Sequence, residues 1–284
     1  MINPSEATPA LVSIVVPVFN GLPHLVGLTE SILAQSHVNL EIIFSEGGGN
    51  DGSLDYLNTL TDPRITILTT PERITAAENW TKATNAATAD YIKLICQDDL
   101  LTPDAVAKQL VDLTREPEAV MAIAQRDVVD THGNVLYPKR GLTGLTDKTM
   151  DGANVIRTCY LQGTNVIGEP LAVLFKAKPL KGSMPWTDHN PLMLDLNTYQ
   201  KVAPLGKVVL RHESVGGFRV SVSSWSTRLA KLQNEQTRQW QQQYALTAIP
   251  KITRAEKTRA FLGRHLQVSL RRAAYTVLKL KKSF

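Results

Sequence analysis

Two adjacent carboxylates, Asp98 and Asp99, follow an apolar run at residues 91–95 that reads as a buried strand. A helix is expected to begin just beyond them, because Thr102 can cap it and Pro103 suits its first position. The pair should therefore lie on a loop at the carboxyl end of a strand, where open α/β sheets bind ligands. A divalent cation carrying substrate phosphates would relieve their mutual repulsion, since Mg²⁺ is usually held by one or two carboxylates plus phosphate oxygens. Taken alone, the pair fits a solvated helix start equally well.

Strand and helix patterns alternate through the first half of the chain. Apolar, β-branched runs predict strands at 12–18, 41–45, 65–68 and 91–95. Pro17 is expected to end the first of them, since proline cannot donate to a ladder. Helical patterns fall between the strands, at 23–35, 54–60 and 74–86. The alternation predicts an α/β fold with a doubly wound, mostly parallel sheet.

The second half is less regular. Its patterns predict strands at 121–125, 128–137, 171–175 and 208–210, and helices at 151–160, 192–202 and from 223 to the end, with a break near Pro250. No repeat or low-complexity linker separates the halves, so we expect one continuous sheet.

Composition excludes several classes of protein. The 284 residues are 43% hydrophobic and 20% charged, as in an ordinary globular protein. No apolar run approaches the ~18 residues of a membrane span. Residues 1–10 have neither the basic region nor the apolar core of a signal peptide, which predicts a cytoplasmic protein. Cys96 and Cys159 are far apart and lack metal-ligand spacing.

A glycine-rich loop offers a different chemistry. Gly47, Gly49 and Gly52 form a Gly-x-Gly-x-x-Gly pattern between a strand and a helix, and Glu72 lies 20 residues beyond. This is the dinucleotide-binding pattern of NAD-type oxidoreductases. It follows the second strand rather than the first, and Asp51 would repel a pyrophosphate, so both features count against that function.

Five segments, taken together and in order, resemble the family 2 glycosyltransferases of the GT-A fold. They are residues 12–20, 41–53, 76–79, 91–101 and 165–175. The resemblance extends from Val12 to about Ser226. It implies a GT-A catalytic domain at 1–225, with a nucleotide-sugar-binding half at 11–130 and an acceptor half at 131–225. Residues 226–284 would be a helical, basic extension.

The resemblance also implies roles for individual residues in binding the donor. The positions that match contacts to the nucleotide base are Pro17, Val18, Asn20 and Glu46. Asp51 matches a later aspartate of the glycine loop, Arg73 a basic position near the nucleotide, and Arg219 a segment near the diphosphate. Asp98 matches the residue that meets the ribose, and Asp99 the residue that holds Mg²⁺ or Mn²⁺.

Asp195 matches the family's general base. A carboxylate near the attacking hydroxyl can take its proton, while a metal neutralises the leaving diphosphate as a Lewis acid. One base without a nucleophile implies one in-line displacement, and hence inversion at the anomeric carbon. The resemblance implies a nucleotide-diphosphate sugar as donor, a saccharide or lipid-linked acceptor, and a place in bacterial surface polysaccharide synthesis.

The chain departs from the family's pattern in its glycine loop, where Gly47-Gly48-Gly49 replace most of the usual Asp-Asp-Gly-Ser-x-Asp, and at single positions. Glu46 replaces the usual aspartate, and Leu194 stands where an acid usually precedes the base. Ser221 replaces a common histidine. The longer Glu46 side chain leaves the choice of donor open.

The C-terminal residues are strongly basic. Residues 250–284 carry a formal charge of +9, against −4 for the rest of the chain. On a helix, Leu262, Leu266 and Leu270 share one face with Ala273, Val277 and Leu280, and most of the cations lie opposite, including Arg264, Arg271, Arg272, Lys279 and Lys282. This pattern suits an anionic membrane surface. The alternative is a helix packed on the catalytic domain with its basic face in solvent; no motif supports nucleic-acid binding, and none is expected.

Three other functions compete with the glycosyltransferase. They are the NAD-type oxidoreductase, a non-catalytic membrane- or nucleic-acid-binding protein with a basic tail, and a nucleotidyltransferase that uses paired aspartates with a metal.

Overall fold

The computed structural model describes residues 9–220 and 232–280, and the side chains up to residue 271. Its strands are β1 (Val12–Val18), β2 (Leu40–Glu46), β3 (Ile65–Leu68), β4 (Tyr91–Leu94), β5 (Leu100–Leu101), β6 (Ala119–Val129), β7 (Val135–Arg140), β8 (Thr149–Asp151), β9 (Val173–Lys176) and β10 (Lys207–Arg219). Its α-helices are α1 (His24–Leu33), α2 (Ser53–Asn58), α3 (Ala76–Ala86), α4 (Ala105–Arg115), α5 (Gly152–Gln162), α6 (Ala177–Gly182), α7 (Leu194–Val202), α9 (Gln233–Thr247) and α10 (Arg254–Leu280).

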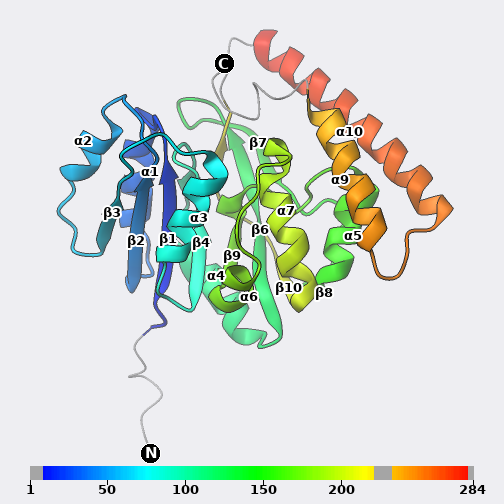
Figure 1. The fold of residues 1–284 in the computed structure, drawn as a ribbon, viewed down its shortest axis with the longest axis horizontal. Coiled ribbons are helices and arrows are strands. Elements are labelled where there is room, and N and C mark those ends of the chain that lie inside the picture. Colours follow the sequence, from blue (N-terminus) through cyan, green and yellow to red (C-terminus); the bar gives the residue numbers. More distant parts are fainter. Residues whose placement is uncertain (1–8, 221–231, 281–284) are drawn as a thin grey trace, which may run out of the picture.

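All ten strands join one twisted sheet, whose main order is β3-β2-β1-β4-β9-β6-β10-β5 (Figure 1). The strands β1, β2, β3, β4, β6 and β10 run in one direction, while β9 lies between β4 and β6 and runs against both. The predicted α/β fold with a doubly wound, mostly parallel sheet is confirmed, and both halves share that sheet.

Helices cover both faces of the sheet, because successive side chains of a strand point to opposite faces. From β1, Val12, Ile14 and Val16 enter a core with α1, α2 and α4. Val15 points the other way, into a core with α3, α5, α6 and α7. This second core also receives Trp240 from α9 and Ala260 from α10. The two C-terminal helices therefore share the core of the domain. The predicted domain boundary at residues 225 and 226 lies outside the described residues.

The structure differs from the sequence predictions at several places. Pro17 lies inside β1, paired with Ser45, rather than ending the strand. It is tolerated there because β4 pairs with β1 only as far as Val15, so no neighbour needs the missing N–H on that side. The strand β6 covers the one predicted at 121–125 and the start of the one predicted at 128–137, and β7 covers the end of the latter, so a turn divides the second predicted strand. The helix after the paired aspartates begins at Ala105, without a side-chain cap, because β5 intervenes.

A lysine lies buried in the middle of the sheet. The Lys93 ammonium on β4 donates to Gln109 Oε1 at 2.7 Å and to the Leu171 carbonyl at 2.6 Å. Burial lowers its pKa to about 7. Gln109 on α4 in turn donates to the Ala172 carbonyl at 2.8 Å. This network fastens the short helical turn at Pro170–Ala172 to the centre of the molecule.

Replacing Lys93 by Met tests that network. Gln109 Oε1 and the Leu171 carbonyl would lose their donor inside the core, and each such unpaired group costs about 1–3 kcal/mol. We expect the free energy of unfolding to fall by roughly 2–4 kcal/mol in urea titrations followed by circular dichroism. The exposed Lys178→Met control should stay within about 0.5 kcal/mol of wild type. Equal stability of the two variants would show that the network contributes nothing.

Candidate active site

The loop that follows β4 carries the paired aspartates. Asp99 is only 1% exposed. Its Oδ1 accepts a hydrogen bond from the Arg219 N–H at 3.1 Å, and its Oδ2 is buried without a hydrogen-bond partner. A buried polar atom without a partner is costly. This oxygen therefore marks a place that a cation would stabilise.

Burial raises the pKa of both carboxyls. For Asp99 the rise is large, because the charge of Asp98 adds to the effect of burial. A bound divalent cation would reverse both shifts, since it favours the charged forms. No cluster of three or more His, Cys, Asp or Glu side chains is arranged to hold a metal within residues 9–220 and 232–271. Asp98 and Asp99 alone could supply only one or two of the ligands of Mg²⁺ or Mn²⁺, and phosphate oxygens and water would have to complete the set.

Arg219, at the end of β10, is a buried clamp between two loops. Its Nε donates to the Asp98 carbonyl at 2.8 Å, and one terminal nitrogen donates to the Asp130 and Thr131 carbonyls at 3.0 and 2.7 Å. Three of its five N–H donors therefore hold backbone oxygens. In the structure Arg219 holds the aspartate loop in place. The predicted contact of Arg219 with the diphosphate stays a prediction.

The conformation of the glycine loop depends on Glu46 and Asn20, two residues that the family resemblance assigns to contacts with the nucleotide base. Glu46, buried at the end of β2, accepts hydrogen bonds from the Gly48 and Gly49 N–H groups at 2.9 and 2.6 Å. Asn20, just beyond β1, accepts one from the Asn50 N–H at 2.8 Å. Both side chains thus organise this loop, and their predicted contacts with a base stay predictions.

Asp51 also has a structural role. Its Oδ1 accepts hydrogen bonds from the Ser53 N–H at 3.0 Å and from the Ser53 hydroxyl at 2.6 Å, at the start of α2. Its Oδ2 accepts one from the Leu22 N–H at 2.9 Å, which ties the glycine loop to the loop after β1. Burial opposes ionisation, but these hydrogen bonds hold the pKa of Asp51 below its ordinary value.

The remaining predicted donor residues lie beside this loop. Pro17 and Val18 are buried at the end of β1, and the Val18 carbonyl accepts hydrogen bonds from the Gly47 N–H at 2.8 Å and the Asn79 amide at 3.0 Å. The exposed Arg73 places its guanidinium 4.7 Å from the centre of the Phe19 ring. Positive charge and an aromatic face therefore flank the carboxyl ends of β1 and β2.

Asp195, at the start of α7, is held in one orientation. Its Oδ2 accepts a hydrogen bond from the Asn165 amide at 2.8 Å, and its Oδ1 accepts one from the Leu196 N–H at 2.7 Å. Asn165 is itself fixed, because its Oδ1 accepts from the Ile167 and Gly168 N–H groups. Burial, together with the negative charge of Glu169, raises the pKa of Asp195 to about 7. A carboxyl with such a pKa is suited to take a proton near neutral pH.

Four carboxylates converge around one thiol. Burial raises the pKa of the Cys96 thiol well above its ordinary value, and four negative charges raise it further: those of Asp99, Asp98, Asp195 and Glu169. The structure thus brings the predicted metal residue and the predicted base to one place, although 96 positions separate Asp99 from Asp195.

Sequence reasoning missed two residues of this site, Glu169 and Arg126. Glu169 forms an ion pair with Arg126 of β6, which is largely buried. Glu169 does lie in the segment 165–175 that resembles the family. A signal was therefore present, but nothing in the spacing pairs it with an arginine 43 positions earlier.

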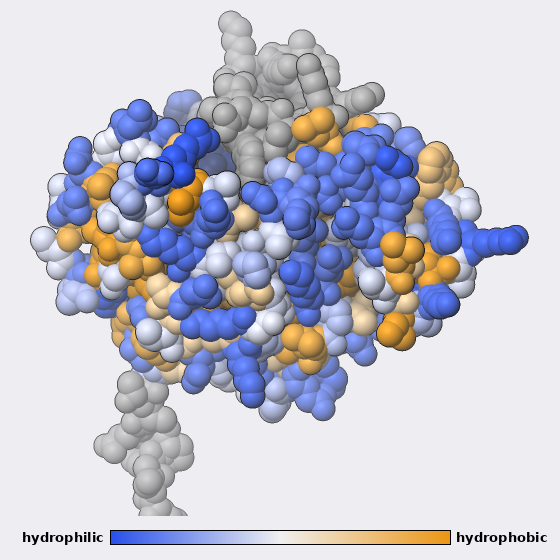
Figure 2. Space-filling model, in the orientation of Figure 1, coloured by the Kyte–Doolittle hydropathy of each residue, from blue (hydrophilic) through white to orange (hydrophobic). Residues whose placement is uncertain are grey.

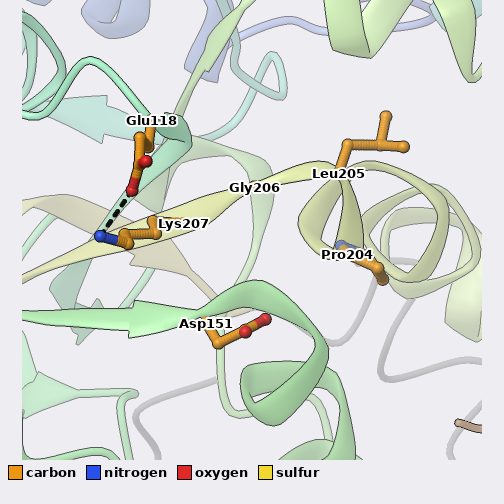
Figure 3. Close-up of a pocket in the computed structure, with 6 residues that line it drawn as sticks. All are labelled: Glu118, Asp151, Pro204, Leu205, Gly206 and Lys207. Atoms are coloured by element: carbon orange, nitrogen blue, oxygen red, sulfur yellow. Dashed lines mark ion pairs between the residues drawn. The ribbon is translucent and has the colours of Figure 1, made fainter.

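A hollow at the opposite edge of the sheet lacks such convergence. It is lined by Glu118, Asp151, Pro204, Leu205, Gly206 and Lys207 (Figure 3). Figure 3 shows the Lys207 ammonium turned toward Glu118, at 2.6 Å, and the Asp151 carboxylate turned to the other side. The two charges of the ion pair offset each other, and Asp151 accepts a hydrogen bond from the Ala153 N–H at the start of α5.

The sequence matches a known family. The model of the family described as Glycosyl transferase family 2 matches residues 13–175, more than half of the chain. This chain belongs to glycosyl transferase family 2. The glycine loop therefore lies within the region that matches this family, as its position after the second strand already favours.

Two curated relatives are similar to part of this chain. An uncharacterized glycosyltransferase of Haemophilus influenzae is 30% identical over 129 residues, which cover 45% of this chain and 48% of the relative. Chondroitin synthase of Pasteurella multocida is 30% identical over 129 residues, which cover 44% of this chain and 13% of the synthase. The chain thus matches about half of the first protein and a small part of the second.

Solved structures with the same fold cover nearly the whole chain. Residues 1–349 of TarS from S. aureus align with a TM-score of 0.66 and 12% identity, over 91% of this chain and 72% of that one. The mannosyltransferase PcManGT of Pyrobaculum calidifontis, in complex with GDP-Man and Mn²⁺, aligns with a TM-score of 0.62 and 14% identity, over 97% and 76%. At this identity the likeness shows the fold, and the predicted GT-A architecture is confirmed.

The pKa of Asp195 predicts how the transfer rate depends on pH. A general base must be unprotonated, so kcat/KM should fall about tenfold per pH unit below a pKa of about 7. Glu169→Gln removes a charge that raises this pKa, so the acid limb should move to lower pH. Initial transfer rates between about pH 5 and 9 would measure the acid limb of wild type and that of Glu169→Gln. The exposed Glu30→Gln is the control. An acid limb that stays in place in Glu169→Gln would assign it to another group.

Proposed function

We propose that the protein transfers a sugar from a nucleotide-diphosphate sugar to a hydroxyl group of a saccharide or lipid-linked acceptor. The convergence of Asp98, Asp99 and Asp195 around Cys96 carries this proposal. It brings a carboxylate with an unpartnered buried oxygen together with a second carboxylate whose pKa is near neutral. The first suits a diphosphate with its cation, and the second suits a hydroxyl that must lose a proton.

In this proposal the chain's residues bind, orient and accept a proton. Asp99 would hold Mg²⁺ or Mn²⁺, and the bound ion would supply positive charge to the leaving diphosphate. Arg219 keeps the aspartate loop against β10. Asn165 fixes the Asp195 carboxylate, which takes the proton of the attacking hydroxyl. A single base with no covalent step implies inversion at the anomeric carbon.

The relatives support a place in polysaccharide synthesis. One curated relative is a chondroitin synthase, and another is a putative teichuronic acid biosynthesis glycosyltransferase of Bacillus subtilis, 31% identical over 102 residues. TarS has been solved in complex with UDP and with UDP-GlcNAc, and PcManGT with GDP-Man and Mn²⁺. We therefore propose a nucleotide-sugar donor, a divalent cation and a role in building a bacterial surface polysaccharide.

Nucleotide binding tests the proposal directly. Thermal stability would be measured with UDP, dTDP, GDP, CDP and NAD, each with and without Mn²⁺. We expect one nucleoside diphosphate to raise the midpoint by several degrees in a metal-dependent way, because a ligand at ~100 times its Kd adds about 2.7 kcal/mol. Asp99→Asn should abolish this shift, and the exposed Asp147→Asn should retain it.

The base is tested in the same assay. Asp195→Asn should keep the nucleotide shift while its transfer rate falls by about 10²–10⁴-fold. A shift from NAD alone, independent of metal, would favour the oxidoreductase instead. Full transfer activity in Asp99→Asn would contradict the metal assignment.

The C-terminal extension supports a membrane-bound setting. The helix α10 packs against α5 through Ala260 and Arg264, which are buried, and an ion pair of 2.7 Å joins Glu256 to Arg157 of α5. The expected solvent-facing basic side is therefore wrong for Arg264. Instead a leucine stripe formed by Leu262, Leu266 and Leu270 faces outward, with 54–60% of each side chain exposed.

We propose that this leucine stripe docks on an anionic membrane. The exposed cations Lys251, Arg254, Lys257 and Arg259 lie on the same helix or just before it, and Figure 2 shows hydrophobic and hydrophilic patches side by side along this flank. Their charge attracts anionic lipids but would repel a second copy of the same face. In the described part of the chain no helix is long and apolar enough to cross a bilayer.

Vesicle sedimentation tests the leucine stripe. Wild type should bind vesicles that contain phosphatidylglycerol and release from them as salt increases. The triple variant Leu262→Gln, Leu266→Gln, Leu270→Gln should bind at least about tenfold more weakly, because each buried leucine is worth about 1.5–3 kcal/mol. The exposed Leu205→Gln is the control. Unchanged vesicle binding by the triple variant would contradict the proposal. A wild-type dimer that the three substitutions dissociate would also contradict it, because the leucine stripe would then contact a second copy of the chain.

A further inference from the structure

The transferred sugar has a defined place in any such reaction. Its anomeric carbon must lie between the leaving diphosphate and the attacking hydroxyl. On the proposed function, Asp99 marks the first of these positions and Asp195 the second. Any polar side chain fixed between the two carboxylates therefore faces the sugar itself rather than the nucleotide.

Glu169 is linked to the Asp195 end of that interval through Asn165. Asn165 donates from one amide nitrogen both to Asp195 Oδ2, at 2.8 Å, and to the Gly168 carbonyl, at 3.0 Å. The turn that ends at Glu169 is therefore one hydrogen bond from the predicted base. The negative charge of Glu169 also raises the pKa of both Asp195 and Asp99, so its carboxylate lies near each of them.

The Arg126 side chain fixes this carboxylate by an ion pair. Its Nε pairs with Oε2 of Glu169. The guanidinium lies in a cradle made by Gly141 and Gly168, whose φ angles are +103° and +107°. A Cβ at Gly141 would come within 2.6 Å of the guanidinium, and one at Gly168 within 3.2 Å. The cradle thus exists only because both positions lack a side chain.

The carboxylate is fixed but still accessible. The Glu169 side chain keeps 27% of its surface exposed, whereas the Arg126 side chain keeps 10%. Arg126 engages Oε2, so the other oxygen can accept hydrogen bonds from outside. A fixed carboxylate is a strong acceptor for neutral O–H donors, and sugar hydroxyls are donors of that kind.

We propose that Glu169 binds hydroxyl groups of the transferred sugar, and that Arg126 positions it for this task. The inference rests on the proposed function, because it needs a sugar to lie between Asp99 and Asp195. It assigns to Glu169 the recognition of the sugar and leaves the nucleotide to the glycine loop and the residues around it. The resemblance expects an acid directly before the base, but this chain has Leu194 there. Glu169 is an acid that comes from a different element, the segment before β9.

The test compares two affinities in each protein. Calorimetry with Mn²⁺ would measure a nucleoside diphosphate and its nucleotide sugar, choosing the tightest wild-type ligand among UDP-glucose, UDP-galactose, UDP-GlcNAc and GDP-mannose. In Glu169→Ala the nucleotide sugar should bind about 10- to 100-fold more weakly, the usual effect of losing a hydrogen bond to a charged group. The nucleoside diphosphate should bind as in wild type. The affinity of Glu169→Gln for the nucleotide sugar should lie between those of wild type and Glu169→Ala. The exposed Glu30→Ala should match wild type.

Each other outcome has a definite meaning. Equal affinity of Glu169→Ala and wild type for the nucleotide sugar would overturn the inference. Equal losses for the diphosphate and the nucleotide sugar would also overturn it, because Glu169 would then shape the nucleotide site. Failure of wild type to bind any of the nucleotides would remove the proposed function, and this inference with it. The ratio of the two affinities separates recognition of the sugar from a general loss of stability.

Discussion

Repulsion among the carboxylates around Cys96 is the constraint that the rest of the structure has to satisfy. Three of these four carboxylates are held by a partner from another part of the chain: Asp99 by the Arg219 backbone N–H, Asp195 by Asn165, and Glu169 by Arg126. The two arginines are themselves buried, and the Arg219 guanidinium donates to backbone carbonyls. Such a site favours a ligand that brings its own cation.

The direction of β9 explains how distant residues reach this site. Because β9 runs against β4, the beginning of β9 lies at the edge where β4 ends. The segment before β9, which contains Asn165 and Glu169, therefore arrives beside the loop of Asp98 and Asp99. Lys93 reinforces this arrangement, since its ammonium binds the Leu171 carbonyl two residues beyond Glu169. One antiparallel strand inserted into a parallel sheet thus joins the two halves of the site.

Local patterns predicted the elements that depend on local properties. The strand at 65–68 was predicted to the residue, and the strand at 12–18 and the aspartate loop were found because apolar runs and paired acids are visible in sequence. The length of β10 was not predicted. Arg211, His212 and Glu213 interrupt its apolar pattern, at an irregularity in the pairing with β6. The Arg126–Glu169 pair could not be predicted either. It depends on which strands are neighbours, and an isolated sequence does not contain that information. The same limit applies to α10: Leu262, Leu266 and Leu270 share an exposed face, but Arg264 packs inward, and the side chains beyond residue 271 lie outside the described residues.

The packing of α10 connects the leucine stripe with the acceptor side of the site. Arg271 donates to the Thr164 hydroxyl at 2.6 Å, and Thr164 precedes Asn165, which orients Asp195. The backbone of Gly163 lies so close to Arg264 that a Cβ there would meet its backbone nitrogen at 2.3 Å. The helix and the loop are therefore one packed unit. A membrane that bound the leucine stripe would hold this loop at a fixed distance from the lipid surface, which suits an acceptor carried on a lipid better than one free in solution.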